Sequence, residues 1–248
     1  MIAHGAVVPH APVVLEDIQQ SLDEGRRVRK AVDELDFSNA DVVVLVSPHG
    51  PAAGIYGRCE GSLRGFGIDE AEAARNTDAG LSRALARAWG HEPIDGPVDF
   101  GIVVPILLGV GGDLPMVAAC LPQTTGPRAG PSSESVDAAK GLAGALATVA
   151  DERAVAVVAS AHLSAGLSAR APLTKVSGAT EVDREVVEAL EADPARIENL
   201  LGPLHEVGNA CGVGPLSVLR HLLEGWRSEG LTYQAPYGVG YMVGQWSR

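Results

Sequence analysis

The sequence predicts an α/β protein, a single domain with a central mixed, mostly parallel sheet and helices on both faces. Apolar runs rich in β-branched residues alternate with helical stretches along the chain, which is the pattern of such folds. The runs are nearly continuous, as expected for strands covered on both sides. With 248 residues, 46% of them hydrophobic, the chain is long enough to bury a core without disulfides or a structural metal.

Five apolar runs are the predicted core strands: Ile2–Val8, Val42–Val46, Ile102–Leu108, Met116–Leu121 and Ala154–Ala159. The tail Tyr233–Trp246 alternates aromatic residues with glycine and predicts a late strand or hairpin.

Helices are expected between the strands. Asp69–Trp89 and Val136–Ala150 are rich in alanine with scattered charges. Thr180-Glu-Val-Asp183 resembles an N-terminal capping box, and Asp193-Pro194 predicts a cap followed by proline at the first helical position. Pro215 is expected to open a further helix. One apolar face of that helix consists of Val218, Leu219, Leu222, Leu223 and Trp226.

The stretch Gln123–Ser133 contains two prolines, two glycines and several hydroxyl residues, which predicts a loop. Because similar strand and helix patterns continue on both sides of it, we expect one domain over residues 1–248 rather than two.

Charge and cysteine content disfavour several classes of function. The 31 acidic and 19 basic residues give a net charge of −12, which disfavours binding to nucleic acid or to anionic membranes. Cys59, Cys120 and Cys211 form neither a disulfide framework nor a CxxC zinc pair, so reduced thiols in a cytoplasmic protein are expected. No apolar run reaches the length of a transmembrane helix, and no secretory leader is recognised.

Two histidines follow predicted strands in the same context. His10 comes after Val7-Val-Pro9, and His49 comes after Val46-Ser-Pro48. Ligands of open α/β sheets bind beyond the carboxyl ends of the strands, so the pair could share a metal ion or a substrate, whereas each imidazole alone could merely cap a turn. A shared metal ion predicts ring nitrogens roughly 3–4 Å apart. His162 follows a third strand and is the candidate proton shuttle.

The segment Leu204–Pro215 places Glu206, Asn209 and Cys211 among three glycines, just before a helix. Glycines allow tight turns and a close approach of the backbone to a ligand, although an ordinary helix end explains them equally. The chain has no GxSxG elbow and no GxxxxGK[ST] loop, which disfavours serine hydrolases of the common type and nucleotide hydrolases.

Six short stretches, in this order and spanning nearly the whole chain, resemble one superfamily. They are Val7-Val-Pro-His-Ala-Pro12, Val46-Ser-Pro-His-Gly50, Asp99-Phe-Gly-Ile-Val-Val-Pro-Ile106, Ala159-Ser-Ala-His-Leu-Ser164, Cys211-Gly-Val-Gly-Pro215 and Tyr237-Gly-Val-Gly-Tyr241. The chain is similar in these stretches to the class III extradiol ring-cleavage dioxygenase β-subunit superfamily, which includes protocatechuate dioxygenase β-subunits and the Memo-like proteins.

This resemblance implies a site and an activity. In the dioxygenases two histidines and a glutamate hold a non-haem Fe(II), whose open positions accept a catechol and O₂. The corresponding ligands here are His10, His49 and Glu206, with His162 as the catalytic acid and base. The implied substrate is a small aromatic diol or related compound, as in aromatic compound catabolism. The implied assembly is a homo-oligomer or a complex with a partner subunit.

Two departures from the dioxygenase pattern carry alternatives. Phe100 stands where these enzymes commonly have a histidine, and phenyl predicts a less polar pocket. Cys211-Gly212 matches the Cys-Gly of Memo-like proteins, so Cys211 is the alternative ligand to Glu206. A thiolate favours zinc or copper over iron.

The substrate-contacting residues are expected to be Phe100, Ser160 and Asn209. Three hypotheses stay open: an Fe(II) dioxygenase, a Memo-like copper- or iron-binding redox protein, and a binding protein that keeps the fold without chemistry. A glutamate pointing at the two histidines supports the first, and the cysteine doing so supports the second.

Overall fold

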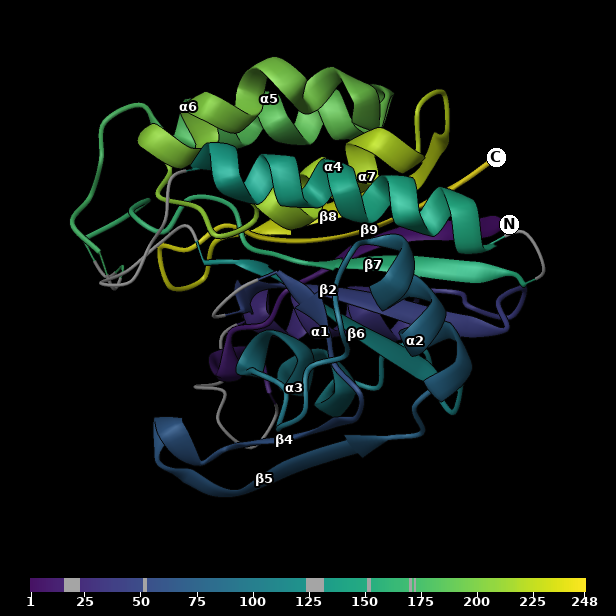
Figure 1. The fold of residues 1–248 in the computed structure, drawn as a ribbon. Helices are drawn as coiled ribbons and strands as arrows, with labels where there is room; N and C mark the ends of the chain where they lie inside the picture. Colours follow the sequence, from purple (N-terminus) through teal and green to yellow (C-terminus); the bar gives the residue numbers. More distant parts are fainter. Residues whose placement is uncertain (16–22, 51–52, 124–131, 151–152, 170, 172) are drawn as a thin grey trace.

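The computed structural model describes residues 1–15, 23–50, 53–123, 132–150, 153–169, 171 and 173–248. Its centre is a seven-stranded sheet in the order β3-β6-β2-β7-β1-β9-β8 (Figure 1). The strands are β1 Ile2–Val8, β2 Val42–Gly50, β3 Gly54–Ile55, β6 Met116–Pro122, β7 Val155–Ser160, β8 Arg227–Gln234 and β9 Tyr241–Ser247. The four strands β6, β2, β7 and β1 run parallel, whereas β3, β8 and β9 pair antiparallel with their neighbours. The predicted fold class is confirmed.

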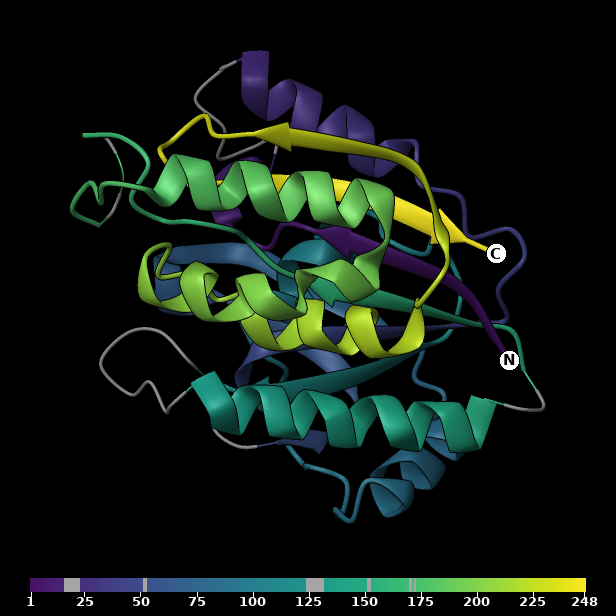
Figure 2. The same cartoon turned by 90° about the horizontal axis from the view of Figure 1, so that it is seen from above.

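Helices cover both faces of the sheet. The helices are α1 Asp23–Asp33, α2 Ala79–Ala88, α3 Phe100–Leu107, α4 Ser132–Val149, α5 Ala179–Ala192, α6 Leu201–Glu206 and α7 Val213–Leu222. Helices α4, α5 and α7 lie along one face (Figure 2), and their apolar residues form one core with the strands. Helices α1 and α3 pack on the other face, together with a hairpin of β4 Cys59–Leu63 and β5 Ile68–Arg75. No helix within the described ranges is long and apolar enough to span a bilayer.

Successive side chains along the strands point alternately into the two hydrophobic cores, one on each face of the sheet. In β2, Val42, Val44 and Val46 face the α4–α7 side, whereas Val43 and Leu45 face α3. This double burial explains the continuous apolar runs, and four of the five predicted core strands are confirmed.

The fifth predicted strand, Ile102–Leu108, is wrong because this segment lies in helix α3. The run is buried almost throughout, so its hydrophobicity has no periodicity that distinguishes a helix from a strand. The deciding local signal is Asp99, whose side chain accepts a hydrogen bond from the Gly101 N–H and caps the helix.

The predicted helix Asp69–Trp89 is correct only in its second half. Its first half forms β5, which pairs antiparallel with β4, so strand pairing overrides the helix propensity of the alanines and glutamates. The helix α2 begins only after Asp78, whose carboxylate accepts a hydrogen bond from the Leu81 N–H.

The predicted capping box is also wrong. Helix α5 begins at Ala179 after Gly178, so Thr180 lies inside the helix and Asp183 points into the core. The cap at Asp193 is confirmed, since its side chain accepts from the Ala195 N–H of a short 3₁₀ helix, Pro194–Leu200.

The C-terminal hairpin is confirmed as β8 and β9, and α4 and α7 form close to their predicted positions. Most of the predicted loop Gln123–Ser133 lies outside the described residues.

Candidate metal centre

Three histidines and one cysteine meet at the carboxyl edge of the parallel strands. His10 follows β1, His49 lies near the end of β2, His162 follows β7, and Cys211 lies in the turn before α7. The Nε2 atoms of His10 and His49 are 3.0 Å apart, which agrees with the predicted spacing, and Sγ of Cys211 lies 3.3 Å from the same His10 nitrogen. Ligand atoms of His10, His162 and Cys211 all lie within 4.8 Å of one another. We call these four residues the donor cluster.

His10 is buried and held from behind by a serine. Its Nδ1 lies 2.9 Å from Oγ of Ser160, the last residue of β7. The Ser160 hydroxyl donates in turn to the Gly101 carbonyl at 2.5 Å. Ser160 is therefore a fully buried orienting partner of a histidine, and its expected contact with a substrate stays a prediction.

His162 and Cys211 are fixed by the main chain. Nδ1 of His162 donates to the Leu163 carbonyl at 2.7 Å, because a carbonyl oxygen only accepts, and this leaves its Nε2 as a lone-pair donor. The Gly212 N–H donates to the His162 carbonyl at 3.1 Å. A Cβ at Gly212 would lie 2.7 Å from that oxygen, so only glycine allows this approach next to Cys211.

His49 is positioned through the start of α3. Its backbone N–H donates to Oγ of Ser47 at 3.2 Å, and the Ser47 hydroxyl donates to Oδ1 of Asp99 at 2.6 Å. The Phe100 ring stacks on the His49 ring at 4.3 Å between centroids, and Phe66 packs edge-on against Phe100 at 4.9 Å. Phe100 therefore lies beside the donor cluster, as expected.

Burial sets the protonation of the cluster. It lowers the pKa of His10 well below the usual value, with further lowering by the neighbouring His49 and His162. It also lowers the pKa of His49 to about 3 and that of His162 below 6.5, and it raises the pKa of the Cys211 thiol to about 12. The imidazoles are thus neutral near pH 7, the form in which histidine binds metal ions, whereas the thiol must lose its proton on binding.

The donor set fits a transition metal ion. Four-coordinate zinc sites with Zn–N of about 2.0–2.1 Å and Zn–S of about 2.3 Å place neighbouring ligand atoms roughly 3.3–3.6 Å apart. The nitrogen–nitrogen separation of 3.0 Å and the nitrogen–sulfur separation of 3.3 Å are close to this geometry. His10, His162 and Cys211 would hold the ion, and His49 lies next to His10.

The structure does not bring Glu206 to the cluster. Glu206 ends α6, whose buried face carries Leu201 and Leu204, and the helical repeat turns Glu206 outward, where it is exposed. Cys211 takes the place expected for the carboxylate. Asn209 lies in the turn between Glu206 and Cys211 with φ of 48°, a left-handed backbone conformation, and its expected contact with a substrate stays a prediction.

A second polar group braces the segment that carries His162. The buried Asp183 accepts hydrogen bonds from the Ser164 N–H at 3.0 Å, from the Ser164 hydroxyl at 2.5 Å and from the Tyr233 hydroxyl at 2.6 Å. Burial raises the pKa of Asp183. Its side chain thus ties α5 and β8 to the segment that follows β7.

Several of these residues were missed by the sequence analysis. Ser47 and Asp99 lie inside or beside the motifs that were recognised, and the helix-capping preference of aspartate was the available signal for Asp99. Phe66 sits in a Gly-Phe-Gly turn, but its meeting with Phe100 depends on the β4–β5 hairpin and has no local signal. Asp183 was read as a cap.

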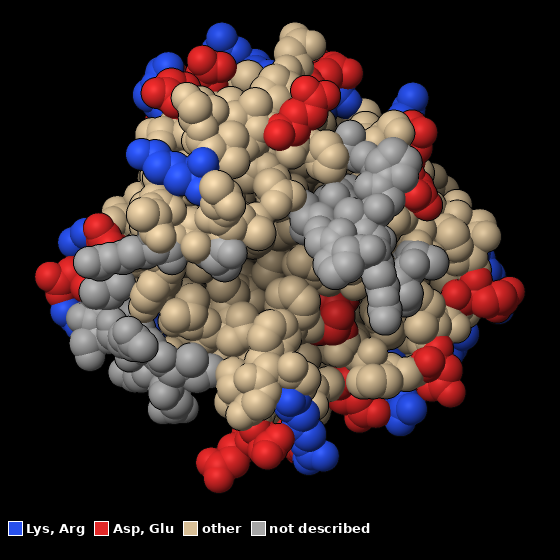
Figure 3. Space-filling model, turned by 90° about the vertical axis from the view of Figure 1, so that its left-hand side faces the viewer, with Lys and Arg blue, Asp and Glu red and all other residues tan. Residues whose placement is uncertain are grey.

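The carboxyl edge of the sheet is hollowed at the surface. The side of the molecule that carries this edge has a central depression lined largely by uncharged residues, with an acidic patch at its margin (Figure 3). His49 and His162 are the partly exposed members of the donor cluster, whereas His10 and Cys211 are buried.

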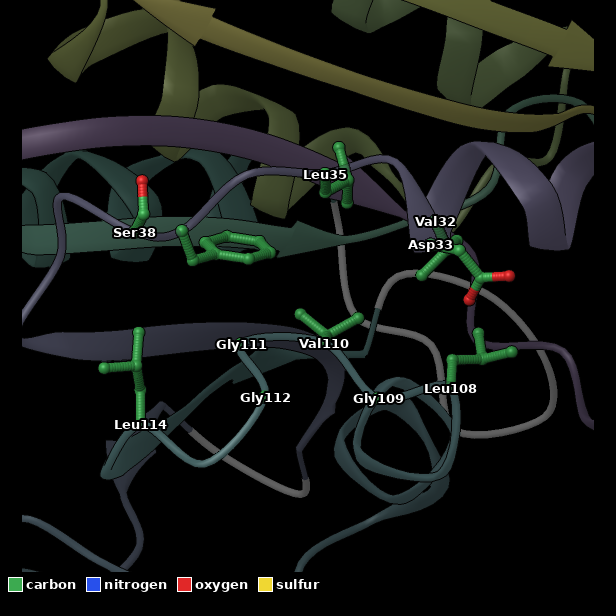
Figure 4. A pocket seen from close by; sticks show the side chains of 11 residues that line it. Val32, Asp33, Leu35, Ser38, Leu108, Gly109, Val110, Gly111, Gly112 and Leu114 are labelled. Atoms are coloured by element: carbon green, nitrogen blue, oxygen red, sulfur yellow. The ribbon is translucent and has the colours of Figure 1, made fainter.

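A separate pocket of about 480 Å³ lies at the opposite, amino-terminal edge of the sheet. Val32 and Leu35 at the end of α1 face Val110 and Leu114 across it (Figure 4). Among the described residues that line this pocket, Asp33 alone has an ionisable side chain, and none of them is a histidine or cysteine.

Comparison with known proteins supports the fold alone. No family model and no curated protein sequence matches the chain. Among solved structures, the chain is similar to the uncharacterized protein JW3007 from Escherichia coli K12, with a TM-score of 0.60 and 16% sequence identity. The similarity covers 98% of this chain and 99% of that one. At this identity the likeness establishes a shared single-domain α/β fold.

Proposed function

We propose that the protein is a Memo-like metal-dependent redox protein, whose ion is bound by His10, His162 and Cys211 with His49 beside them. One observation carries this proposal: the cysteine, and not Glu206, lies within ligand distance of the histidines. A thiolate with imidazoles is a ligand set for copper or zinc and also accommodates iron. A bound copper or iron ion would supply one-electron chemistry.

A redox or catalytic role explains the location of the cluster better than a structural one. The two large apolar cores already account for the fold, so no metal ion is needed to hold it together. Structural zinc sites are closed, whereas this cluster lies at the carboxyl edge of the parallel strands, the edge at which α/β folds commonly bind ligands. The chain's own residues orient the ligands and shield them, with Phe100 excluding water from one side of His49.

The test is metal titration of protein stripped of metal under anaerobic, reducing conditions. Cu(I), Zn(II), Fe(II) and Co(II) are added separately, and Co(II) reports thiolate ligation by its sulfur-to-metal absorption band. Cys211→Ser should lose that band and weaken binding by more than the ~10–100-fold typical of a residue that only orients a ligand. Glu206→Gln, the matched control, should retain both band and affinity.

If Glu206→Gln releases the metal while Cys211→Ser retains it, the Memo-like proposal is wrong. Redox activity is then tested by cycling of the copper- or iron-loaded protein with O₂ and a mild reductant. Wild-type protein that binds Zn(II) but gives no such cycling with copper or iron would limit the function to metal binding.

Extradiol cleavage of a small aromatic diol is the second candidate. The paired His10 and His49 favour it, together with His162 at the side where a catalytic acid and base is expected. Wild-type protein loaded with Fe(II) should cleave simple catechols poorly, because Phe100 offers no proton donor or acceptor, and Phe100→His should increase turnover. A screen for yellow ring-opened products measures this, and efficient cleavage by the unmodified protein would favour the dioxygenase.

A further inference from the structure

A hydrogen-bonded chain runs from His10 to the main chain of α3, and its direction is fixed by chemistry. The Gly101 carbonyl can only accept a hydrogen bond, so the Ser160 hydroxyl donates its one proton to that oxygen, at 2.5 Å. Ser160 Oγ must then accept from Nδ1 of His10, 2.9 Å away. The His10 proton is therefore on Nδ1, and the Nε2 lone pair points at Cys211 and His49.

The acceptor at the end of this chain is available because of a proline. In a regular α-helix the Gly101 carbonyl would receive the N–H of the residue four positions later, which is residue 105. That residue is Pro105, which has no N–H, and it lies inside α3. The same proline that would be costly in an ordinary helix leaves the Gly101 carbonyl free for Ser160.

The space around residue 101 admits only a glycine. A Cβ at this position would lie 2.3 Å from Oγ of Ser47 and 2.8 Å from Oδ1 of Asp99. Glycine lets the first turn of α3 approach the strand ends closely enough for Ser160 to reach its carbonyl.

We propose that Ser160 and Pro105 form a tautomer-setting device, which holds the His10 proton on Nδ1 and keeps Nε2 ready for a metal ion. The consequence for metal affinity rests on the proposed function, but the tautomer is a property of the metal-free protein. Ser160 is thus a positioning residue, because it acts only through His10.

The primary test is the tautomer of His10 in metal-free wild-type protein, read from the ¹⁵N chemical shifts of both ring nitrogens near neutral pH. The expected result is a proton on Nδ1 and a lone pair on Nε2. A His10 with its proton on Nε2 would overturn the proposal, and this result needs no variant.

Variants then test each part of the device. Ser160→Ala should shift His10 toward the Nε2–H form or a mixture, whereas Ser160→Thr, which keeps a hydroxyl, should restore Nδ1–H. Pro105→Ala should give a smaller shift in the same direction, since the new N–H competes for the Gly101 carbonyl. Ser82→Ala is the matched control, because Ser82 is also a buried serine but lies on α2. An unchanged tautomer in Ser160→Ala would overturn the role of the serine.

Metal affinity separates this inference from the proposed function. Loss of a residue that orients a ligand typically weakens binding by ~10–100-fold, and that loss is expected for Ser160→Ala but not for Ser82→Ala. Nδ1–H in a wild-type protein that binds no metal would refute the function and leave the tautomer device standing. Tight metal binding by a His10 with its proton on Nε2 before loading would refute the device alone.

Discussion

The two halves of the donor cluster are held in different ways. His10 and His49 are positioned through the hydroxyls of Ser160 and Ser47, both of which lead to the first turn of α3. His162 and Cys211 are positioned by main-chain hydrogen bonds, as in the contact of Gly212 with the His162 carbonyl.

Because the two halves are held differently, single substitutions should act on them differently. Hydroxyl links can be removed one at a time with little change of shape, so the half with His10 and His49 can be adjusted without loss of the fold. Main-chain links fail only when a glycine gains a side chain or a buried brace is lost, so the half with His162 and Cys211 should couple metal binding to stability.

Acid should destabilise both halves and should lower the stability of the metal-free protein more than any single substitution below. The folded-state pKa values of His10, His49 and His162 are lowered, so below pH 6.5 the unfolded chain binds more protons than the folded one. Stability of the metal-free protein is then complete above about pH 6.5 and falls with decreasing pH, by up to about 1.4 kcal/mol per pH unit for each histidine. For His49 the loss continues to its folded pKa of about 3.

Urea unfolding between about pH 8 and pH 4 measures this dependence. His49→Asn should reduce the slope of stability against pH, and His91→Asn, at a histidine that packs on Trp89 rather than in the cluster, should leave that slope unchanged. A slope that survives substitution of His10 and His49 together would mean that the histidine pair is not the acid-sensitive half.

Gly212→Ala should damage the main-chain half directly. Its Cβ would lie 2.7 Å from the His162 carbonyl oxygen, and backbone cannot yield as a flexible side chain can. We expect a loss of about 1–3 kcal/mol in the free energy of unfolding, together with weaker metal binding. Gly202→Ala is the control, because nothing lies within 4 Å of its Cβ and alanine favours the helix. Equal stability of the two variants would contradict the close approach.

Asp183→Asn should affect the same half from further away. The Ser164 and Tyr233 hydroxyls donate hydrogen bonds to the carboxylate, and in the amide one of its oxygens is replaced by an N–H₂ group, which cannot accept them. We expect a loss of about 1–3 kcal/mol in the free energy of unfolding. Tyr233→Phe removes a single donor and should cost about 1 kcal/mol. The ¹⁵N shifts of His10 should not change in either variant. If they do, the two halves are one coupled unit.

Ser47→Ala tests the other half with the smallest expected effect. It removes one hydroxyl between the His49 N–H and Asp99, at a cost of about 1 kcal/mol, while the Phe100 stack keeps the ring in place. Metal affinity should fall only a few-fold relative to the ~10–100-fold expected for Ser160→Ala. If Ser47→Ala lowered metal affinity more than Ser160→Ala, the link from Ser47 to the His49 backbone would matter more for binding than the tautomer of His10.

Local signals predicted the parts of the structure that depend on local chemistry. Buried strands read as continuous apolar runs, and a proline before each histidine marked where β1 and the core of β2 end. From these signals the sequence analysis correctly predicted that His10 and His49 lie together at one edge of the sheet. The run Ile102–Leu108 failed because burial on all sides removes the periodicity that identifies a helix.

The third ligand could not be decided from the sequence. Glu206 and Cys211 are five positions apart, and a turn with a left-handed Asn209 separates them, so a small difference in backbone path exchanges one for the other. The role of Ser160 was equally hidden, because its acceptor is a carbonyl exposed by a proline in a segment expected to be a strand.

The pairing of β1 has a consequence for biosynthesis. This first strand lies between β7 and β9, which are made about 150 and 240 residues later. Until β7 and β9 have been synthesised, β1 has no strand to pair with. Its apolar side chains and unpaired backbone then favour aggregation, which chaperones counteract. Such long-range pairing also slows folding. Under the proposed function, a metal ion would therefore find its complete ligand set only after Cys211 has been synthesised and β1 has paired with β7 and β9.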